Sequence, residues 1–167
     1  GARLRQPEVS VAQRGNARRD RVLAIVGCAV LARADRADAV IMAAAVADYT
    51  PETGASAQKI EKGGSLNVAL VRTPDILAEL STAAEVVLVG FAAETDDVEE
   101  EGRAKLRGKG LQLLVANEVG REGTGFGSDS NRAAILAADG ADIPMREWTK
   151  RELASAICER LAKLLTA

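Results

Sequence analysis

The sequence contains no histidine and only two cysteines. Without histidine, the chain cannot build a Ser-His-Asp or Cys-His nucleophile, and a histidine-based metal site is also excluded. Cys28 and Cys158 lie far apart in segments with helical spacing. This pattern supports neither a zinc knuckle nor a disulfide framework. We therefore expect a reducing, cytoplasmic setting.

Aromatic residues are scarce, at 2% of the chain, whereas apolar residues make up 47%. The core must therefore be filled by Ala, Val, Leu and Ile, which is typical of an α/β sandwich with close helix–sheet packing. The chain of 167 residues is long enough for one domain and too short for two ordinary ones.

A surplus of basic residues and a long apolar run are also missing. The net charge of -2 argues against general affinity for nucleic acid, which needs a basic surface to displace counterions. No apolar segment reaches the length of a membrane span, and the first ten residues do not have the pattern of a signal peptide. We expect neither a nucleic acid nor a membrane as a partner.

The order of patterns along the chain predicts alternating helices and strands. Residues 1–20 are polar, and their apolar residues show neither the spacing of a helix nor the alternation of a strand, which predicts an irregular lead-in. Apolar spacing then predicts helices over 21–33, 73–80 and 149–165, and a helix that begins after residue 96. Unbroken apolar runs predict buried strands that start at Ala39 and span 85–92, 111–116 and 132–138, with a short strand at 66–71. Asp96 and Glu99 have capping-box spacing at the start of the helix after residue 96, and Thr149 and Glu152 have the same spacing at the start of the last helix.

The stretch from Ala39 to Lys62 is the first candidate for a ligand site. Its buried run ends in small side chains at 43–47, which leave the backbone uncovered for a flat ligand. Asp48 comes next, at the carboxyl end of a strand, where open α/β sheets bind ligands. Alternatively, Asp48 caps the following turn. Lys59 and Lys62 then follow a connection rich in Gly, Ser and Ala, an arrangement that favours a phosphate-bearing ligand.

A second candidate is the helix start Thr73-Pro74-Asp75. Thr73 is the expected N-cap, Pro74 the first helical residue, and Asp75 is favourable near the positive end of the helix. Free amides at this end can receive the polar edge of a ligand, although the motif can also serve only as a cap.

Three further positions have a structural and a functional interpretation. Phe91, near the end of a predicted strand, is either a core residue or a platform for a base or ribose. Lys105 and Lys109 lie four residues apart on one helix face, which suits a polyphosphate, but Glu101 can instead pair with Lys105. Asn117 either orients a ligand or forms a turn. The glycine-rich segment 120–131 matches neither Walker A nor GxGxxG.

The motifs AAVADYTPE, KIEK, LVRTPDILAEL, VGFAAET, RAKLRGKG, LLVANEV, GFGSDSN and WTKREL follow one another over residues 20–167. In order and spacing this series resembles the phosphopantothenoylcysteine synthetase family, the ligase of coenzyme A biosynthesis. The resemblance implies a three-layer, Rossmann-like α/β sandwich with a mainly parallel sheet and a flexible lysine-bearing flap. It also implies a homodimer and a fused or associated flavin-dependent decarboxylase.

The resemblance further implies a reaction in two halves. With CTP and Mg²⁺, the family converts the carboxylate of 4'-phosphopantothenate to an acyl-cytidylate and releases pyrophosphate. The amine of cysteine then forms the amide and releases CMP. Lysines and a metal offset the charge of the pentavalent transition state.

Carried over residue by residue, the resemblance assigns catalysis to Lys59 on the flap. The nucleotide-binding residues that it implies are Ala44, Ala45, Asp48, Pro74, Asp75, Ile76, Leu77, Phe91, Lys105, Lys109 and Asn117. Metal ligands are unknown.

Two departures from the family pattern stand out. The family's flap commonly reads KIKK, whereas Glu61 here replaces a basic residue and weakens attraction for phosphate. An upstream strand and an SSGKMG-like motif are not found in residues 1–20. We therefore expect residues 21–167 to form a single CTP-binding ligase domain that is incomplete at its amino terminus.

Two rival functions follow from these patterns. One is a CTP-binding module without complete ligase activity, because the amino-terminal substrate motif is missing. The other is a dinucleotide oxidoreductase of the same fold class, which the missing glycine fingerprint disfavours.

Overall fold

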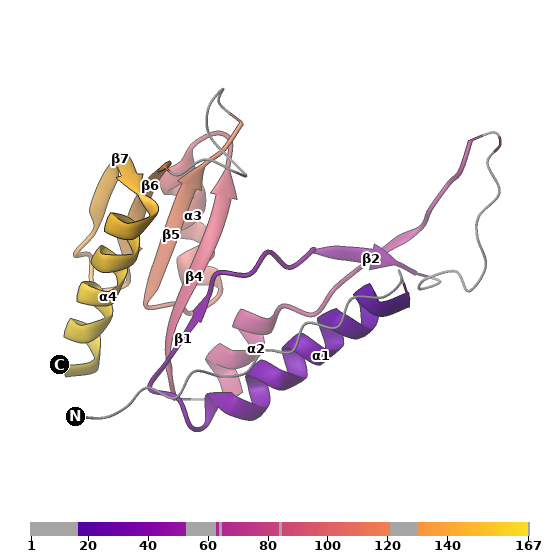
Figure 1. Cartoon of the computed structure of the whole chain (residues 1–167), viewed down its shortest axis with the longest axis horizontal. Coiled ribbons are helices and arrows are strands. Elements are labelled where there is room, and N and C mark those ends of the chain that lie inside the picture. Colours follow the sequence, from indigo (N-terminus) through magenta and orange to yellow (C-terminus); the bar gives the residue numbers. More distant parts are fainter. Residues whose placement is uncertain (1–16, 53–62, 64, 84, 121–129, 167) are drawn as a thin grey trace.

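The apolar runs of the sequence form a five-stranded sheet in the order β1-β4-β5-β6-β7 (Figure 1). The computed structural model describes residues 17–52, 63, 65–83, 85–120 and 130–166. The strands β1 (Ala39–Met42), β4 (Val87–Glu94) and β5 (Leu113–Glu118) are parallel. The strands β6 (Ser130–Ala137) and β7 (Ile143–Thr149) continue the sheet in antiparallel fashion.

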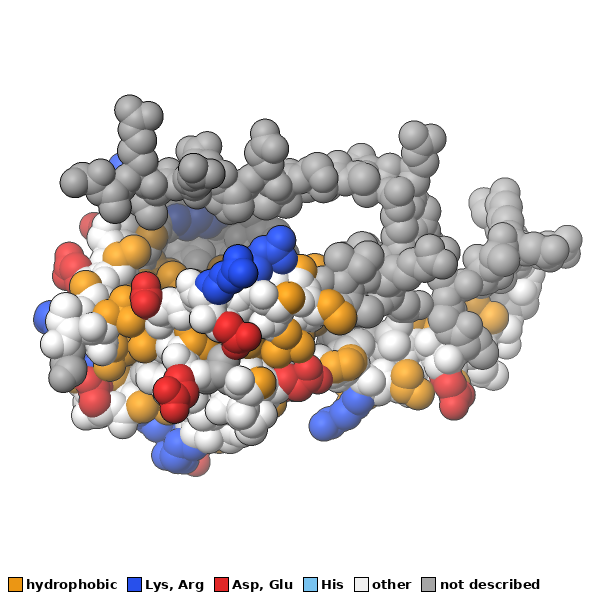
Figure 2. All heavy atoms as spheres, turned by 90° about the horizontal axis from the view of Figure 1, so that it is seen from below, with side chains coloured by type: hydrophobic (Ala, Val, Ile, Leu, Met, Phe, Trp, Pro, Cys, Tyr) orange, Lys and Arg blue, Asp and Glu red, His pale blue; other side chains and the backbone are white. Residues whose placement is uncertain are grey.

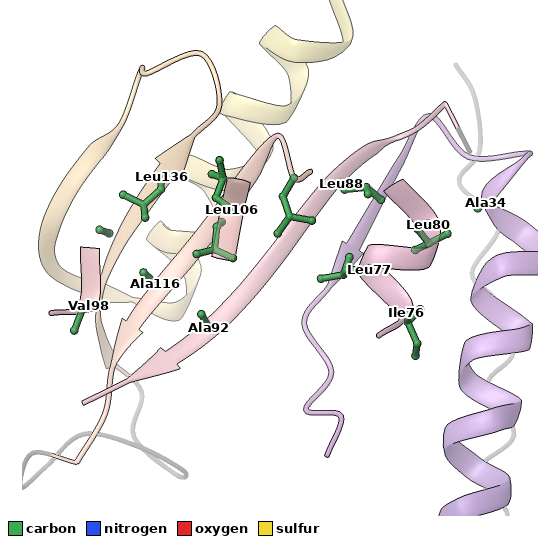
Figure 3. Packing of buried hydrophobic residues seen from close by; sticks show 13 residues of the cluster. Ala34, Ile76, Leu77, Leu80, Leu88, Ala92, Val98, Leu106, Ala116 and Leu136 are labelled. Carbon is green, nitrogen blue, oxygen red and sulfur yellow. The ribbon is translucent and has the colours of Figure 1, made fainter. Parts of the chain in front are cut away.

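Helices cover both faces of this sheet, which confirms the predicted three-layer α/β fold. One hydrophobic cluster lies between the sheet and three helices, α1 (Ala17–Ala34), α2 (Ile76–Ala83) and α3 (Val98–Gly108) (Figure 3). A second cluster lies between the opposite face and α4 (Lys150–Thr166). Alternate residues of β4 and β5 point to the two clusters, as the pleat of a strand requires.

Helix α3 packs very closely onto the sheet at Gly102. A Cβ atom placed there would lie 2.8 Å from Leu136 Cδ1 and 2.9 Å from Ala116 Cβ. Real side chains do not approach so closely, so the absence of a side chain at this position sets the distance between helix and sheet.

A two-stranded antiparallel ribbon projects away from the five-stranded sheet (Figure 1). It consists of β2 (Tyr49–Pro51) and β3 (Leu70–Arg72). We call these two strands the arm. Leu70, Val71 and Tyr49 on the arm are exposed by 40% or more, so the ribbon presents an apolar surface to solvent.

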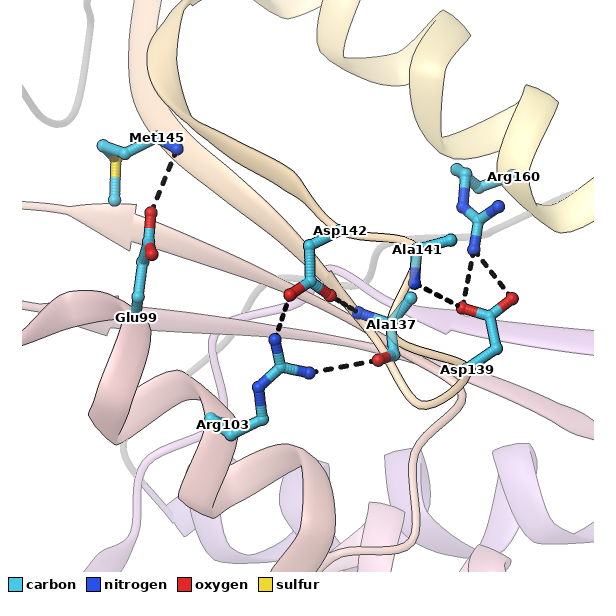
Figure 4. Close-up of polar contacts among 8 residues, drawn as sticks. All are labelled: Glu99, Arg103, Ala137, Asp139, Ala141, Asp142, Met145 and Arg160. Atoms are coloured by element: carbon cyan, nitrogen blue, oxygen red, sulfur yellow. Dashed lines mark hydrogen bonds and ion pairs between the residues drawn. The ribbon is translucent and has the colours of Figure 1, made fainter.

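The turn between β6 and β7 is fixed by two arginines from different helices (Figure 4). Arg103 of α3 donates to the carbonyl of Ala137 and pairs with Asp142. Arg160 of α4 pairs with Asp139 at 2.9 Å. The antiparallel end of the sheet is thereby tied to helices on both of its faces.

The predicted capping box is present at the start of α4 and absent at the start of α3. The predicted Thr149 and Glu152 box is confirmed, because the Glu152 carboxylate accepts from the amide and hydroxyl of Thr149 and the Glu152 amide donates back. The predicted box at Asp96 and Glu99 is wrong. Glu99 accepts from the Met145 amide instead, and the residue before α3 is Asp97, with a left-handed φ of 42°.

The start of α2 is also shifted from its predicted place. The helix begins at Ile76, and the Asp75 carboxylate accepts a hydrogen bond of 3.2 Å from the Ala78 amide. Asp75 is therefore the N-cap, and the assignment of that role to Thr73 is wrong. The Thr73 hydroxyl is used elsewhere, on the carbonyl of Ala47.

Strand bounds differ from the predicted ones by a few residues. Two strands extend two residues further than expected, to Glu94 and Glu118, so Asn117 lies inside β5 rather than after it. The first strand ends earlier, at Met42, and strand 66–71 is reduced to β3. Strand β7 was not predicted.

The surface carries charges of both signs. On the face that Figure 2 shows, acidic and basic side chains are interspersed among hydrophobic ones. Cys28 and Cys158 are both exposed and free. Within the described residues, no helix is both long and apolar enough to cross a membrane.

Candidate functional site

The carboxyl ends of the three parallel strands lie along one edge of the sheet. The segments that leave this edge are residues 43–48 after β1, 95–97 after β4 and 119–120 after β5. Helices α2 and α3 both begin there, because each leads back toward the start of the next parallel strand. This edge is where open α/β sheets bind ligands.

The segment after β1 is joined to the residues that precede α2. The Thr73 amide donates to the Asp48 carbonyl at 3.0 Å, and the Thr73 hydroxyl donates to the Ala47 carbonyl at 2.6 Å. The side chains of Ala44, Ala45 and Asp48 are exposed. Two sets of predicted nucleotide-binding residues, far apart in sequence, are thus held side by side.

Asp75 links the start of α2 to the end of α3. One carboxylate oxygen caps α2, and the other pairs with Lys109 Nζ at 2.9 Å. Burial opposes ionisation of Asp75, but the hydrogen bonds from Lys109 and the Ala78 amide outweigh it, so the pKa of Asp75 lies below its usual value. Lys109 is therefore held at the positive end of α2, where anions are favoured.

Lys105 lies one helical turn before Lys109 and pairs with Glu94, the last residue of β4. It does not pair with Glu101, the partner expected for an exposed helix pair. The Glu94 side chain is only 12% exposed, whereas that of Lys105 is 42% exposed. The carboxylate thus holds the ammonium group over the carboxyl edge and leaves part of it open to solvent.

The other predicted nucleotide-binding residues at the start of α2 differ in how exposed they are. Pro74 is exposed, whereas the side chains of Ile76 and Leu77 are buried in the cluster under α1, α2 and α3. Ile76 and Leu77 can therefore contact a ligand only through their backbone, at the helix terminus.

Phe91 and Asn117 lie on the other face of the sheet. Phe91 packs against the cluster under α4, and the strand pleat points Asn117 to the same face. They are thus not brought together with Lys105 and Lys109. Asn117 Oδ1 is buried, and in the described part of the chain it has no hydrogen-bond partner. A buried acceptor of this kind usually has a partner, so a ligand group or water is expected there.

A hollow of about 500 Å³ opens beside this edge, over the start of α3. Glu118 and Arg132 form an ion pair in its wall, next to Glu94 in the strand register. All other charged residues that line it are acidic, including Asp96 and Glu99. Among the described residues, no group of three potential ligand side chains is placed to hold a metal ion.

The predicted catalytic residue, Lys59, lies outside the described residues. Glu94 and the inter-segment role of Thr73 were missed by the sequence interpretation. The sequence does contain a pattern that indicates a role for Glu94: every second residue of this strand is buried, as at Leu88 and Ala92, and Glu94 is on the same face. No local signal indicates the partner of Thr73, which lies 26 residues away.

Comparison with known proteins gives a consistent match. The family model described as the DNA/pantothenate metabolism flavoprotein C-terminal domain matches residues 24–165. The coenzyme A biosynthesis bifunctional protein CoaBC of Bacillus subtilis is 42% identical over 137 residues, which are 81% of this chain and 34% of that protein. CoaBC of Mycobacterium tuberculosis strain H37Rv is 41% identical over 150 residues, 82% of this chain and 35% of the relative. The chain thus spans about a third of these relatives.

Solved structures agree with this match. The crystal structure of the C-terminal domain of a CoaBC protein has a TM-score of 0.65 and 32% identity, over 86% of this chain and 62% of that one. A Streptococcus pneumoniae protein titled as a DNA/pantothenate metabolism flavoprotein has a TM-score of 0.63 at 21% identity, over 83% and 69% of the two chains, and shows the same fold. Since the family model covers most of the sequence and the relatives exceed 40% identity, the chain belongs to the family of DNA/pantothenate metabolism flavoprotein C-terminal domains.

Proposed function

We propose that the chain is the CTP-dependent part of a phosphopantothenate–cysteine ligase in coenzyme A biosynthesis. The observation that supports this most is the meeting of the Asp48 segment, the start of α2 and the lysines of α3 at one edge of the sheet. Similarity to CoaBC proteins over four fifths of the chain supports the same reaction.

In this proposal the nucleotide lies along the carboxyl edge. Ala44, Ala45 and the backbone at 74–77 contact CTP together with Asp48, and Lys105 and Lys109 hold its phosphates. The Lys109 ammonium group at the positive end of a short helix and the Lys105 ammonium group at the end of β4 provide an electrostatic environment that suits a polyphosphate. We include Phe91 and Asn117 among the nucleotide-binding residues because of the family resemblance. For Asn117, the buried Oδ1 atom without a hydrogen-bond partner in the described part of the chain supports this role.

The chemistry begins when the carboxylate of 4'-phosphopantothenate attacks the α-phosphorus of CTP. A bond from carboxylate oxygen to phosphorus forms, and pyrophosphate leaves. The amine of cysteine then attacks the acyl carbon of the acyl-cytidylate. The carbon–nitrogen bond of the amide forms, the bond from the acyl carbon to the phosphate oxygen breaks, and CMP leaves. We assign Lys59 to stabilisation of the phosphate charge in this sequence. The resemblance implies Mg²⁺ as well, but the described residues offer no group of three potential ligand side chains, so its ligands are not assigned.

A pyrophosphate-release assay with CTP and 4'-phosphopantothenate tests the activation step. We expect release with CTP that exceeds release with ATP. Lys59→Gln should lower turnover far more than it lowers CTP affinity, because a group that serves the transition state adds little to ground-state binding. CTP binding without pyrophosphate release from the wild type would instead favour the alternative function, a CTP-binding module.

We also propose a homodimer in which the arm contributes to the interface. Leu70 and Tyr49 are more than half exposed on the arm, an apolar surface of the kind that a partner chain covers. Sedimentation equilibrium of Leu70→Glu should show a monomer, whereas Leu165→Glu on α4, where an apolar side chain is 46% exposed, should leave the dimer intact. A fused or associated flavin-dependent decarboxylase and a cytoplasmic location complete the proposal; the relatives are described as bifunctional proteins.

A further inference from the structure

Thr73 stands at the junction of three parts of the candidate site. It follows β3 directly, so it lies where the arm returns to the body of the protein, and it precedes the start of α2 by three residues. Its partners, Ala47 and Asp48, precede β2, the other strand of the arm. The residue is therefore at the base of the arm, between the segment after β1 and α2.

The two hydrogen bonds of Thr73 have different origins. The bond from its amide to the Asp48 carbonyl extends the ladder between β2 and β3 by one step, and any residue other than proline can make it. The bond from its hydroxyl to the Ala47 carbonyl, at 2.6 Å, needs a serine or threonine. In the described part of the chain, Thr73 makes both hydrogen bonds that connect residues 44–48 to another element.

This hydroxyl does not serve as the helix cap that its sequence position suggests. The cap of α2 is Asp75, which also holds Lys109. Removal of the Thr73 hydroxyl therefore leaves α2 capped and Lys109 in place. What it loosens is the segment that carries Asp48, which then keeps only the bond from the amide of residue 73.

We propose that Thr73 is a positioning residue for nucleotide binding, whose hydroxyl holds the Asp48 segment against the start of α2. This inference rests on the proposed function, because it takes Asp48 and the start of α2 as contacts of CTP. A segment that is fixed before binding loses less conformational freedom when the ligand arrives, so the hydroxyl raises affinity without touching the nucleotide.

The test compares Thr73→Val with Thr73→Ser. Valine keeps the branched shape and the amide but lacks the hydroxyl, whereas serine keeps the hydroxyl. We expect Thr73→Val to weaken CTP binding roughly three- to tenfold in a calorimetric titration, the effect of one ordinary hydrogen bond. Thr73→Ser should bind within about twofold of the wild type, because one hydroxyl replaces another.

A second measurement follows the ligand-free chain. Hydrogen exchange at the amide of residue 73 reports whether the segment opens, since this amide donates to the Asp48 carbonyl. Its protection should fall in Thr73→Val and stay in Thr73→Ser. The matched control is Thr82→Val in α2, where the hydroxyl bonds only within its own helix turn, to the Glu79 carbonyl. This control should change neither CTP affinity nor protection at residue 73.

The outcomes separate the two proposals. Wild-type CTP affinity in Thr73→Val, or equal losses in the valine and serine variants, overturns the positioning role. A wild-type chain that binds no CTP contradicts the proposed function instead. In that case the exchange data decide alone, and unchanged protection in Thr73→Val overturns the link between Thr73 and the Asp48 segment.

Discussion

The two lysines of the candidate site form ion pairs with carboxylates of the protein itself. Lys105 is bound by Glu94 and Lys109 by Asp75, each from a different element. The pairs differ in burial, because the Glu94 side chain is 12% exposed and that of Asp75 is 45% exposed. Each lysine retains donors beyond the one used by its carboxylate, since an ammonium group has three. The lysines are therefore oriented and still able to bind phosphate.

The first prediction concerns Lys105. Lys105→Ala should weaken CTP binding, and the loss should shrink as salt is added, because salt screens the attraction between ammonium and phosphate. Calorimetric titrations at low and high salt measure both effects. Lys163→Ala is the control, since this lysine lies on α4, over the other face of the sheet. Unchanged CTP affinity at low salt would show that Lys105 does no more than pair with Glu94.

The second prediction concerns Asp75, whose pKa is lowered by Lys109 and the Ala78 amide against the effect of burial. A carboxylate with a lowered pKa in the folded state stabilises the fold above its unfolded-state value, near 3.8, and this contribution is lost as the pH falls below that value. Asp75→Asn keeps a good N-cap but loses the ion pair, so we expect a loss of about 0.5 kcal/mol at pH 7. Urea unfolding at pH 7 and below pH 3 measures the difference, which should vanish in acid; a difference that is independent of pH contradicts this role.

At the scale of elements, close packing on the sheet fixes α3, the helix that carries Lys105 and is followed directly by Lys109. Gly102 allows the approach, and the Arg103 pair with Asp142 fixes the same helix to the turn after β6. The side chains of a helix lean toward its amino terminus, so Lys105 reaches back to Glu94 at the edge where α3 begins.

The third prediction tests this packing. Gly102→Val must displace Leu136 or lift α3, because even a Cβ would lie within 2.9 Å of two neighbours. We expect a loss of about 1 to 3 kcal/mol in the free energy of unfolding, measured by urea denaturation. Gly108→Val in the last turn of α3 is the control, since a Cβ there meets nothing within 4 Å. Equal losses in both variants would mean that only helix propensity changed.

Local signals in the sequence predicted some elements well and others poorly. The Thr149 and Glu152 box forms within four residues, so the sequence pattern was sufficient. Thr73 was mistaken for a cap because its real partner is distant in sequence. Strand β7 was missed because it has no apolar run; apart from the buried Trp148, its side chains are at least partly exposed.

At the scale of the whole molecule, the order of helices and strands follows from the apolar runs, whereas the exact ends of strands do not. Glu94 and Glu118 end two parallel strands and are mostly buried, and each is accepted there because a cation from another element pairs with it. Such pairs are long-range, so sequence spacing could not locate them. The candidate site was predicted in part: Asp48, Asp75 and Lys109 are brought together, whereas Phe91 and Asn117 face the other layer.

The central claim is that this fold binds CTP along the carboxyl edge of its parallel strands. The most direct measurement is a calorimetric titration of the whole chain with CTP in the presence of magnesium, with ATP titrated in parallel. We predict saturable binding of CTP and weaker binding of ATP. No detectable binding of CTP, or equal affinity for CTP and ATP, would contradict the account.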